Sequence, residues 1–544
     1  MDNLDGLLLE IFITTDSPGI TYVNVSTPRY KEQNLHTFSI TKGQVKHITL
    51  PSEIRGNGTE LGNKGVQILS STEVAVFAVN KYKYSTDAYV VFPTDTLGRK
   101  YYVISWPTES EFIIVATKDK TSVDITLVGA EIVYNGITYT SGMTLSIYLQ
   151  KWQTFHAYNE TADFTGTLIT SNNEIAVLSG NLCIQIGEGA CDHTVSQMTP
   201  VETFGHDFVS ISMPNCNSSV SYRIISSEDN TNVKISGMPA VQLSTAGDFY
   251  TFEIKSNSSK IVSADKPIAM AFFANGACND DGRIGDPAMI LMPPVPQFAA
   301  DYTFATIEVP NNPFQNFLAI VIRDIYITGL VLDGHNISSF NWRSVEGNNN
   351  LKVNTLSVND GSHTVYHVDP TVTFLAVATG LSEYNSYGYV AGQRLAPINS
   401  ICTESNTTPG DIIDNDCDGF IDEEIQDGKD DDGDGRIDED LAVFFVDVIT
   451  SSTTTHVTST EINTTYIFSD VTTSSTSTQF ICAKDVRVLT FTIPELLFIA
   501  GIIGLAGAML CCIPCLLLIW RKKISKRQKR VYSRAKPARK PDPF

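Results

Sequence analysis

The stretch Glu73–Asn80, EVAVFAVN, decides the fold because similar stretches recur along the chain. Related stretches are Glu174–Asn181 (EIAVLSGN) and Pro267–Asn275 (PIAMAFFAN), and a weaker fourth copy is Val372–Gly380 (VTFLAVATG). The asparagines that end the first three copies are 101 and 94 residues apart. A unit of about 100 residues is the size of one β-sandwich or of two propeller blades, and the pattern leaves both open.

The sequence around these copies predicts an all-β region. From Phe12 to about Leu395, short β-branched and aromatic runs alternate with Asn, Gly, Asp and Pro turns, and no apolar helical stripe exceeds about two turns. A proline and an aromatic residue follow each of the first three copies: Pro93 with Tyr101 and Tyr102, Pro200 with Phe208, Pro293 with Tyr302. The fold prediction is therefore a series of tandem β-units over residues 1–395.

Three signatures within this region point to a family. They are DAYVVFPTDTLGRKYYVISW (87–106), CDHTVSQMTPVETFGHDF (191–208) and GDPAMILMPPVPQ (285–297). In this order they resemble the N-terminal domain of the IgG Fc-binding protein family, over roughly residues 10–395. The resemblance implies an extracellular recognition or adhesion domain to which no enzyme activity is attributed, with an unidentified protein or glycan as ligand. Mammalian members are mucus-associated proteins that continue into von Willebrand-type repeats.

The segment 402–442 is rich in aspartate and predicts calcium binding. Acids recur at positions 1, 3 and 5 before a glycine at position 6, in two loops that start 16 residues apart. Such spacing turns the chain sharply and directs alternate carboxylates toward a hard cation. Neither loop has the glutamate that an EF-hand needs at position 12, so the segment resembles thrombospondin type 3 repeats. A disordered acidic linker is the alternative. The predicted Ca²⁺ ligands are Asp414, Asp416, Asp418, Asp422, Asp430, Asp432, Asp434 and Asp438.

The cysteines outside the predicted membrane anchor are expected to form disulfides. Cys183 and Cys191 are eight residues apart and suit a short bridged loop, which argues against a nucleophilic role for Cys191 beside His193. Cys216 and Cys278 fall in successive copies and could join them, although four cysteines allow three connectivities. Cys402 and Cys417 would staple the aspartate-rich segment. We predict no catalytic residues and no enzyme activity.

The remaining sequence predicts a stalk, a membrane anchor and a cytoplasmic tail. Residues 443–492 are rich in Ser and Thr and cannot bury a core, which is typical of a disordered, O-glycosylated stalk. Residues 493–520 contain 25 consecutive uncharged residues, enough to cross a bilayer. Residues 521–544 carry 11 basic side chains and one acid, which places the tail in the cytoplasm. Ala500, Gly504 and Ala508 are at the spacing that permits helix dimerisation, and three cysteines near the inner leaflet are candidates for acylation.

These features predict a single-pass surface glycoprotein of the plasma membrane, with its N-terminus outside. Residues 1–494 have a net charge of −31, which argues against nucleic acid as a partner. The opening MDNLDGLLLEIF has no basic n-region and is not a signal peptide, so we expect that the natural start of the protein differs, and export by an unconventional route is the alternative. The expected function is recognition of an extracellular protein or glycan, presented on a calcium-stiffened stalk. The alternative is a self-associating component of a surface coat or mucus layer.

Overall fold

The computed structural model describes residues 8–442 with short gaps, and two further strands, β35 (Ser477–Cys482) and β36 (Arg487–Thr492). The gaps are 31–34, 83–84, 188–190, 277, 279–281, 310–311, 400–402, 412, 418–420, 423, 427 and 429–435. Residues 1–447 and 448–544 form two separate compact bodies. The first body contains four β-rich units. The described elements are antiparallel strands with five single 3₁₀ helices, which confirms the all-β prediction.

The first unit is a sandwich of two sheets. The main sheet has the order β4-β1-β7-β8 and the second sheet the order β3-β2-β6. Ile11 and Ile13 of the main sheet pack against Val23 and Val25 of the second, because alternate residues of each strand face the core. The elements are β1 (Leu8–Thr14), β2 (Ile20–Ser26), β3 (Leu35–Thr41), β4 (Lys46–Leu50), η1 (Ser52–Ile54), β6 (Gln67–Ser70), β7 (Ala75–Tyr82), β8 (Ser85–Val90) and η2 (Thr94–Thr96).

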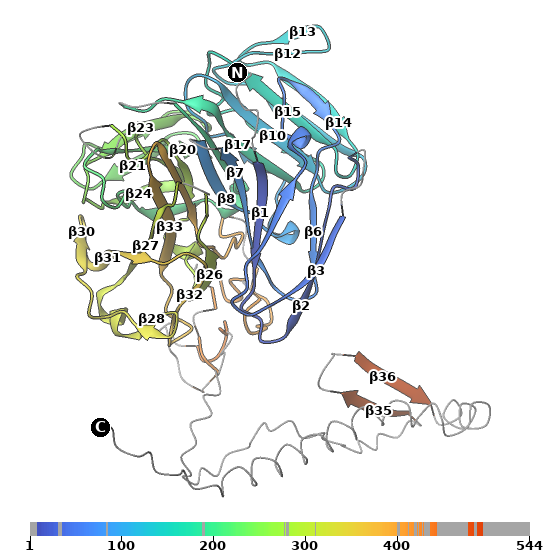
Figure 1. Cartoon of the computed structure of the whole chain (residues 1–544), viewed down its shortest axis with the longest axis vertical. Coiled ribbons are helices and arrows are strands. Elements are labelled where there is room, and N and C mark those ends of the chain that lie inside the picture. The colour runs from blue at the N-terminus through green and yellow to red at the C-terminus, as the bar shows by residue number, and fades with distance from the viewer. Residues whose placement is uncertain are drawn as a thin grey trace, which may run out of the picture. The chain divides into compact units, whose positions relative to one another are not determined.

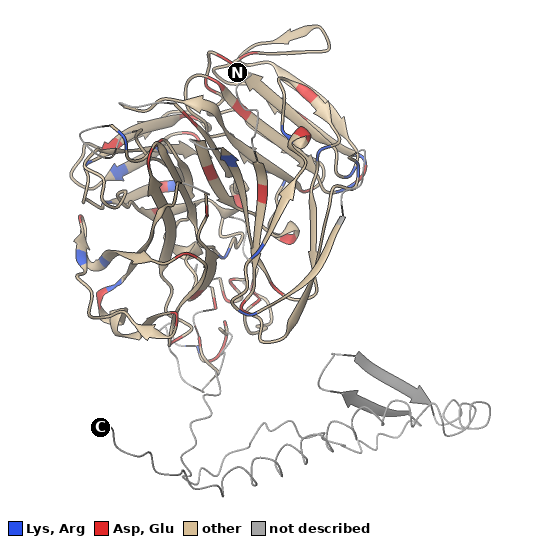
Figure 2. Cartoon of the chain, in the orientation of Figure 1, with Lys and Arg blue, Asp and Glu red and all other residues tan. Residues whose placement is uncertain are grey.

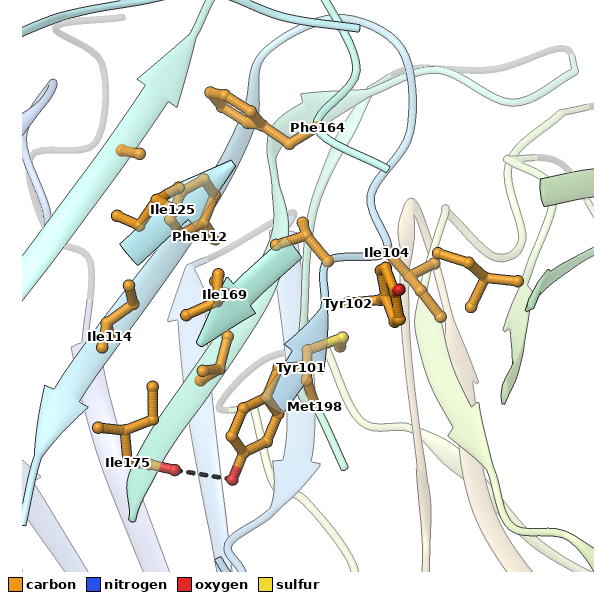
Figure 3. Packing of buried hydrophobic residues seen from close by; sticks show 14 of the residues in the cluster. Tyr101, Tyr102, Ile104, Phe112, Ile114, Ile125, Phe164, Ile169, Ile175 and Met198 are labelled. Carbon is orange, nitrogen blue, oxygen red and sulfur yellow. Dashed lines mark hydrogen bonds between the residues drawn. The ribbon is translucent and has the colours of Figure 1, made fainter. Parts of the chain in front are cut away.

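The second unit repeats this plan. Its main sheet is β18-β17-β10-β15-β5, in which β5 (Glu60–Gly62) comes from the preceding segment, and its second sheet is β14-β11-β16-β9. Figure 3 shows Phe112 and Ile114 of β10 facing Ile125 and Ile169 of the second sheet. The elements are β9 (Lys100–Tyr102), β10 (Ser110–Ala116), β11 (Thr121–Thr126), β12 (Ile132–Tyr134), β13 (Ile137–Tyr139), β14 (Thr144–Leu149), β15 (Thr154–Asn159), β16 (Leu168–Ser171), β17 (Ile175–Ile184), β18 (Asp192–Gln197) and η3 (Val201–Thr203).

The third unit is built around one long strand, β24. The start of β24 pairs with β19 and β21, and its end pairs with β20 and β25, so a single strand serves both layers. The elements are β19 (Gly205–Val209), β20 (Val220–Ser226), β21 (Thr231–Ile235), β22 (Val241–Leu243), β23 (Phe249–Ile254), β24 (Ile261–Phe273), β25 (Met289–Met292) and η4 (Val295–Gln297).

The fourth unit has a main sheet of order β30-β31-β27-β33-β34 and a second sheet of order β26-β32-β28-β29. The weak fourth copy of the sequence motif supplies β33. The elements are β26 (Asp301–Ala305), β27 (Gln315–Arg323), η5 (Asp324–Gly329), β28 (Leu330–Leu332), β29 (His335–Asn336), β30 (Arg343–Val345), β31 (Asn348–Val358), β32 (Ser362–His367), β33 (Leu375–Ser382) and β34 (Asn385–Val390).

Four strands, one from each unit, meet at the centre of residues 1–447. We call β8, β18, β25 and β34 the ring strands: β8 contacts β18 and β34, and β25 contacts the same two. Each ring strand pairs with the strand that carries the repeated motif, β7, β17, β24 or β33. In Figure 1 the units follow one another around this centre, from blue through green to yellow.

The tyrosines that follow two copies of the motif have a structural explanation. The Tyr101 hydroxyl donates to the carbonyl of Ile175 at 2.7 Å, as Figure 3 shows, and accepts from the N–H of Gly98 at 2.8 Å. Tyr302 makes the corresponding bonds, accepting from Ala299 N–H and donating to a carbonyl before β33. The buried hydroxyl therefore ties the start of a unit to the strand that carries its motif.

Two disulfide bonds each close a loop within one unit. Cys183–Cys191 closes the loop between β17 and β18, as predicted. Cys216–Cys278 is also present, but both cysteines lie in the third unit, so this bridge closes one unit and does not join two. The two cysteines follow different copies of the motif, but the unit boundary falls after the ring strand that follows each copy, so both belong to the third unit. Cys417 is disulfide-bonded, and its predicted partner Cys402 lies outside the described residues.

Among the described residues, no helix is long and apolar enough to span a membrane. The predicted anchor (493–520), the tail (521–544), and Ala500, Gly504 and Ala508 lie outside the described residues, as does all of the predicted stalk (443–492) except β35 and β36.

Candidate metal centre and binding cleft

Three carboxylates of the aspartate-rich segment come together. One oxygen each of Asp414, Asp416 and Asp440 lies within 4.8 Å of the others, and this is the one such group of acids, histidines or cysteines in the described part of the chain. Asp416 is 7% exposed and Asp440 is fully buried. Two of the three residues were predicted as ligands from their spacing.

Asp440 was missed by the sequence analysis, and its contacts explain its position. Its Oδ2 accepts the N–H of Asn415 at 3.2 Å, which brings the end of the second loop onto the first. Its Oδ1 has no hydrogen-bond partner among the described residues. Burial, with the charges of Asp422 and Asp416 adding to it, raises the pKa of Asp440 to about 7. An oxygen-only set with an unpartnered carboxylate oxygen fits a hard cation.

A signal for Asp440 exists in the sequence. Counting from the first aspartate of each loop, Glu424 and Asp440 both occupy position 11, one residue before the position at which an EF-hand carries its glutamate. Both residues are fully buried, and the N–H of Glu424 donates to the carbonyl of Asp440 at 2.8 Å. The two loops are thus joined through these equivalent positions.

The other predicted ligands divide into two groups. Asp422 is buried, and Asp438 accepts the N–H of Gly428 at 3.1 Å, and neither belongs to the three-carboxylate group. Asp418, Asp430, Asp432 and Asp434 lie outside the described residues.

A wide cleft of about 2690 Å³ opens between the first two units and reaches the fourth. Its wall includes Trp152 and Tyr158 of the second unit. A volume this far above the roughly 300–1,000 Å³ of small-molecule sites suits a macromolecular ligand or a glycan chain.

A buried polar network lines part of this cleft. His156 Nε2 and Glu111 Oε2 are 2.9 Å apart, and His193 Nδ1 lies 3.9 Å from Glu111 Oε1. Burial raises the pKa of Glu111, but the His156 hydrogen bond and the two histidine charges lower it more, so the net shift is downward. His193 is bonded through Nε2 to the amide of Asn80 at 2.7 Å. Because Cys191 is in a disulfide, its sulfur cannot act with His193 as a nucleophile.

Some acidic side chains are buried within the fold. Figure 2 shows acidic residues on strands inside the β-rich unit as well as in loops. Three of them, Asp87, Asp192 and Asp286, are at most 2% exposed and lie on or beside the ring strands.

The described part of residues 1–447 thus forms four β-rich units around a ring of strands, with a broad cleft between the first two. The model of a family described as IgGFc binding protein matches residues 87–380, which is more than half of the chain. The chain therefore belongs to the IgGFc-binding family.

A relative shows the extent of this relationship. Human IgGFc-binding protein is 25% identical over 376 residues, which cover 67% of this chain and 7% of the human protein. The chain thus spans a small part of its relative's length.

Proposed function

We propose that this chain is a membrane-anchored extracellular recognition protein whose four-unit β-module binds a protein or glycan through the cleft between its first two units. The observation that carries the proposal is family membership over residues 87–380, together with a cleft larger than the usual small-molecule site. The name of the human relative makes the Fc fragment of IgG the first ligand to test.

Tyr158 offers a direct test of the cleft. It lines the cleft on β15, whereas Tyr148 on β14 is 54% exposed and lies outside it. Aromatic residues in a recognition surface often carry much of the binding energy. With the full chain over immobilised Fc and a glycan array, we expect Tyr158→Ala to weaken binding at least about tenfold and Tyr148→Ala less than about twofold. Equal effects of the two substitutions on every ligand would refute the cleft as the binding surface.

The alternative function is a self-associating component of a surface coat. Light scattering of the purified chain separates the two, because a receptor stays monomeric at micromolar concentration and a coat protein forms larger species. Concentration-dependent assembly without any ligand on the arrays would favour the coat and overturn the recognition proposal.

The aspartate-rich segment is proposed to bind Ca²⁺ through Asp414, Asp416 and Asp440. The ion would neutralise three carboxylates that otherwise repel one another, and would fix the two loops together. We expect calcium to raise the thermal midpoint of the full chain, and Asp416→Asn with Asp440→Asn to reduce this rise and the calorimetric heat. The control is Asp95→Asn, which removes one carboxylate charge at an exposed position. Unchanged heat in the double variant would exclude the site.

Residues 443–544 are proposed to supply the glycosylated stalk, the anchor and the cytoplasmic tail, on the strength of their composition alone. No catalytic activity is proposed. Biotinylation of intact cells tests the location: labelling of the β-module together with protection of a tag at residue 544 is expected, and the reverse pattern would invert the topology.

A further inference from the structure

Each ring strand has an oxygen-bearing side chain at its first residue or, for β25, three residues before it. Ser85, Asp192 and Asp286 each precede by eight residues the proline that caps a 3₁₀ helix, and Asn385 is the first residue of β34. The four units therefore place a hydroxyl, two carboxylates and an amide at the equivalent position of the ring. We call these four residues the axial layer.

Three residues of the axial layer are buried and have side-chain oxygens without a hydrogen-bond partner. Asp192 and Asn385 are fully buried and Asp286 is 2% exposed. Within the described residues, both carboxylate oxygens of Asp286, Oδ2 of Asp192 and Oδ1 of Asn385 have no hydrogen-bond partner. Buried acceptors without donors cost roughly 1–3 kcal/mol each, and more when charged, so a native fold seldom leaves four together.

Hydrogen bonds between the units join the chain segments that carry these side chains. The Ser85 hydroxyl donates to Asp192 Oδ1, and the Asn385 amide donates to the Thr86 hydroxyl at 3.1 Å, which leaves its oxygen available. The backbone carbonyl of Asp286 accepts from the hydroxyl of the residue after Asn385. The Asp192 and Asp286 carboxylates act on each other electrostatically.

Asp87, two residues further along β8, is an instructive contrast. Its carboxylate accepts the N–H groups of Ala88 (2.8 Å), Val195 (2.9 Å) and Met289 (3.2 Å), so its oxygens are satisfied by three units. Asp192 accepts only through Oδ1, from the Ser85 hydroxyl and from the His193 N–H at 2.7 Å, and neither carboxylate oxygen of Asp286 accepts a hydrogen bond from the described residues. Burial raises the pKa of Asp286 to about 8, as expected for a carboxylate that is removed from water without a balancing positive charge.

We propose that the axial layer binds one hard divalent cation, calcium, through the carboxylates of Asp192 and Asp286 and the amide oxygen of Asn385. The ligand set contains oxygen alone, carries two negative charges and comes from three different units, which matches the chemistry of calcium. The Thr194 hydroxyl, also buried and unpartnered, lies on the same face of β18 as Asp192 and offers one more oxygen. The ion locks the units around their common centre, so calcium controls the integrity of the whole β-module.

The test counts bound metal in the full chain. With the aspartate-rich site disabled by Asp416→Asn and Asp440→Asn, we expect one tightly held calcium per chain after dialysis, measured by mass spectrometry. Adding Asp286→Asn should remove this ion, whereas adding Asp95→Asn should not. An unchanged calcium content on adding Asp286→Asn, or no ion before it, overturns the proposal.

Two further measurements keep the proposal testable if the Asp286 variant does not fold. Terbium soaked into crystals of the unsubstituted chain should give an anomalous peak among Asp192, Asp286 and Asn385, and the absence of a peak there counts against the site. Neutralisation by protons is the competing explanation. In that case chelation leaves the thermal midpoint of the Asp416→Asn/Asp440→Asn chain unchanged, and stability falls as the pH rises through 8.

Discussion

Removal of the Arg223 side chain should destabilise the β-module. It lies on β20 of the third unit and is 4% exposed. Its Nη1 lies within hydrogen-bonding distance of three groups of the second unit: the carbonyl of Ser105 (2.5 Å), Oδ2 of Asp163 (2.7 Å) and the hydroxyl of Thr165 (2.8 Å). The guanidinium therefore joins two units through one buried ion pair.

The cost of removing it can be worked from these contacts. Taking one partner from a buried ion pair costs about 3–5 kcal/mol, because the other charge stays buried. The guanidinium also lies 4.7 Å from the ring centre of Trp106 and 4.5 Å from that of Phe249, and each cation–π contact adds roughly 0.5–2 kcal/mol. Asp163 keeps partial solvent access, with 17% of its side chain exposed, which reduces the first term. We expect Arg223→Gln to destabilise by about 4 kcal/mol.

Urea unfolding followed by circular dichroism measures this loss, and a double-mutant cycle assigns it to the pair. Asp163→Asn removes the other charge, so the double variant should lose at least about 2 kcal/mol less than the two single losses combined. Arg223→Lys keeps the charge without the planar fork and should fall between the unsubstituted chain and Arg223→Gln. A loss below about 1 kcal/mol for Arg223→Gln, or additive single effects, would refute this account of the interface.

Two other expectations concern stability. Replacing Cys216 and Cys278 by serine opens a loop of 62 residues and should cost about 4 kcal/mol, against about 2.5 for the eight-residue loop of the other disulfide; the reverse order in urea unfolding would contradict the loop-entropy reasoning. Hydrogen bonds from Lys118 and then Arg99 lower the pKa of Glu174 to about 2, so its ion pairs stabilise the fold above the unfolded pKa near 4.5 and are lost as pH falls toward 2. Because the two cations are more than half exposed, the contribution is about 1 kcal/mol, and Glu174→Gln should match the unsubstituted chain at pH 2 but be less stable at pH 6; a constant difference would exclude the pair as its source.

The motif strands could be predicted because local burial dictates their sequence. β33, for example, is buried at every residue, and its continuous apolar run returns despite little identity with EVAVFAVN. The asparagine of the second copy also has a local reason. Asn181 is fully buried, accepts the N–H of Trp106 at 2.9 Å and donates to the carbonyls of Trp106 and Thr108, so its amide supplies both the acceptor and the donors that hold this loop.

The ring and the centre of the metal site could not be predicted because they depend on long-range pairing. Asp87 and Asp192 are separated by 105 positions in the sequence, and their neighbours in the ring are set by the closure of four units. Asp440 reaches Asp414 only because the second loop folds back on the first. A spacing rule read along one loop cannot find a ligand that the other loop supplies.

The position of the aspartate-rich segment changes what calcium would do there. The sequence suggested a spacer that the ion stiffens, yet the segment is attached to the β-module: Arg394 Nη1 donates to the carbonyl of Ile421, and the Arg394 N–H donates to the carbonyl of Gln297 at 3.0 Å. Ile421 is 2% exposed, so its side chain is buried like that of a core residue. Calcium at Asp414, Asp416 and Asp440 would therefore fix the direction in which the chain leaves the module, more than the length of the stalk. Since Asp422 also borders the cleft, loss of the ion would reach the proposed binding surface itself.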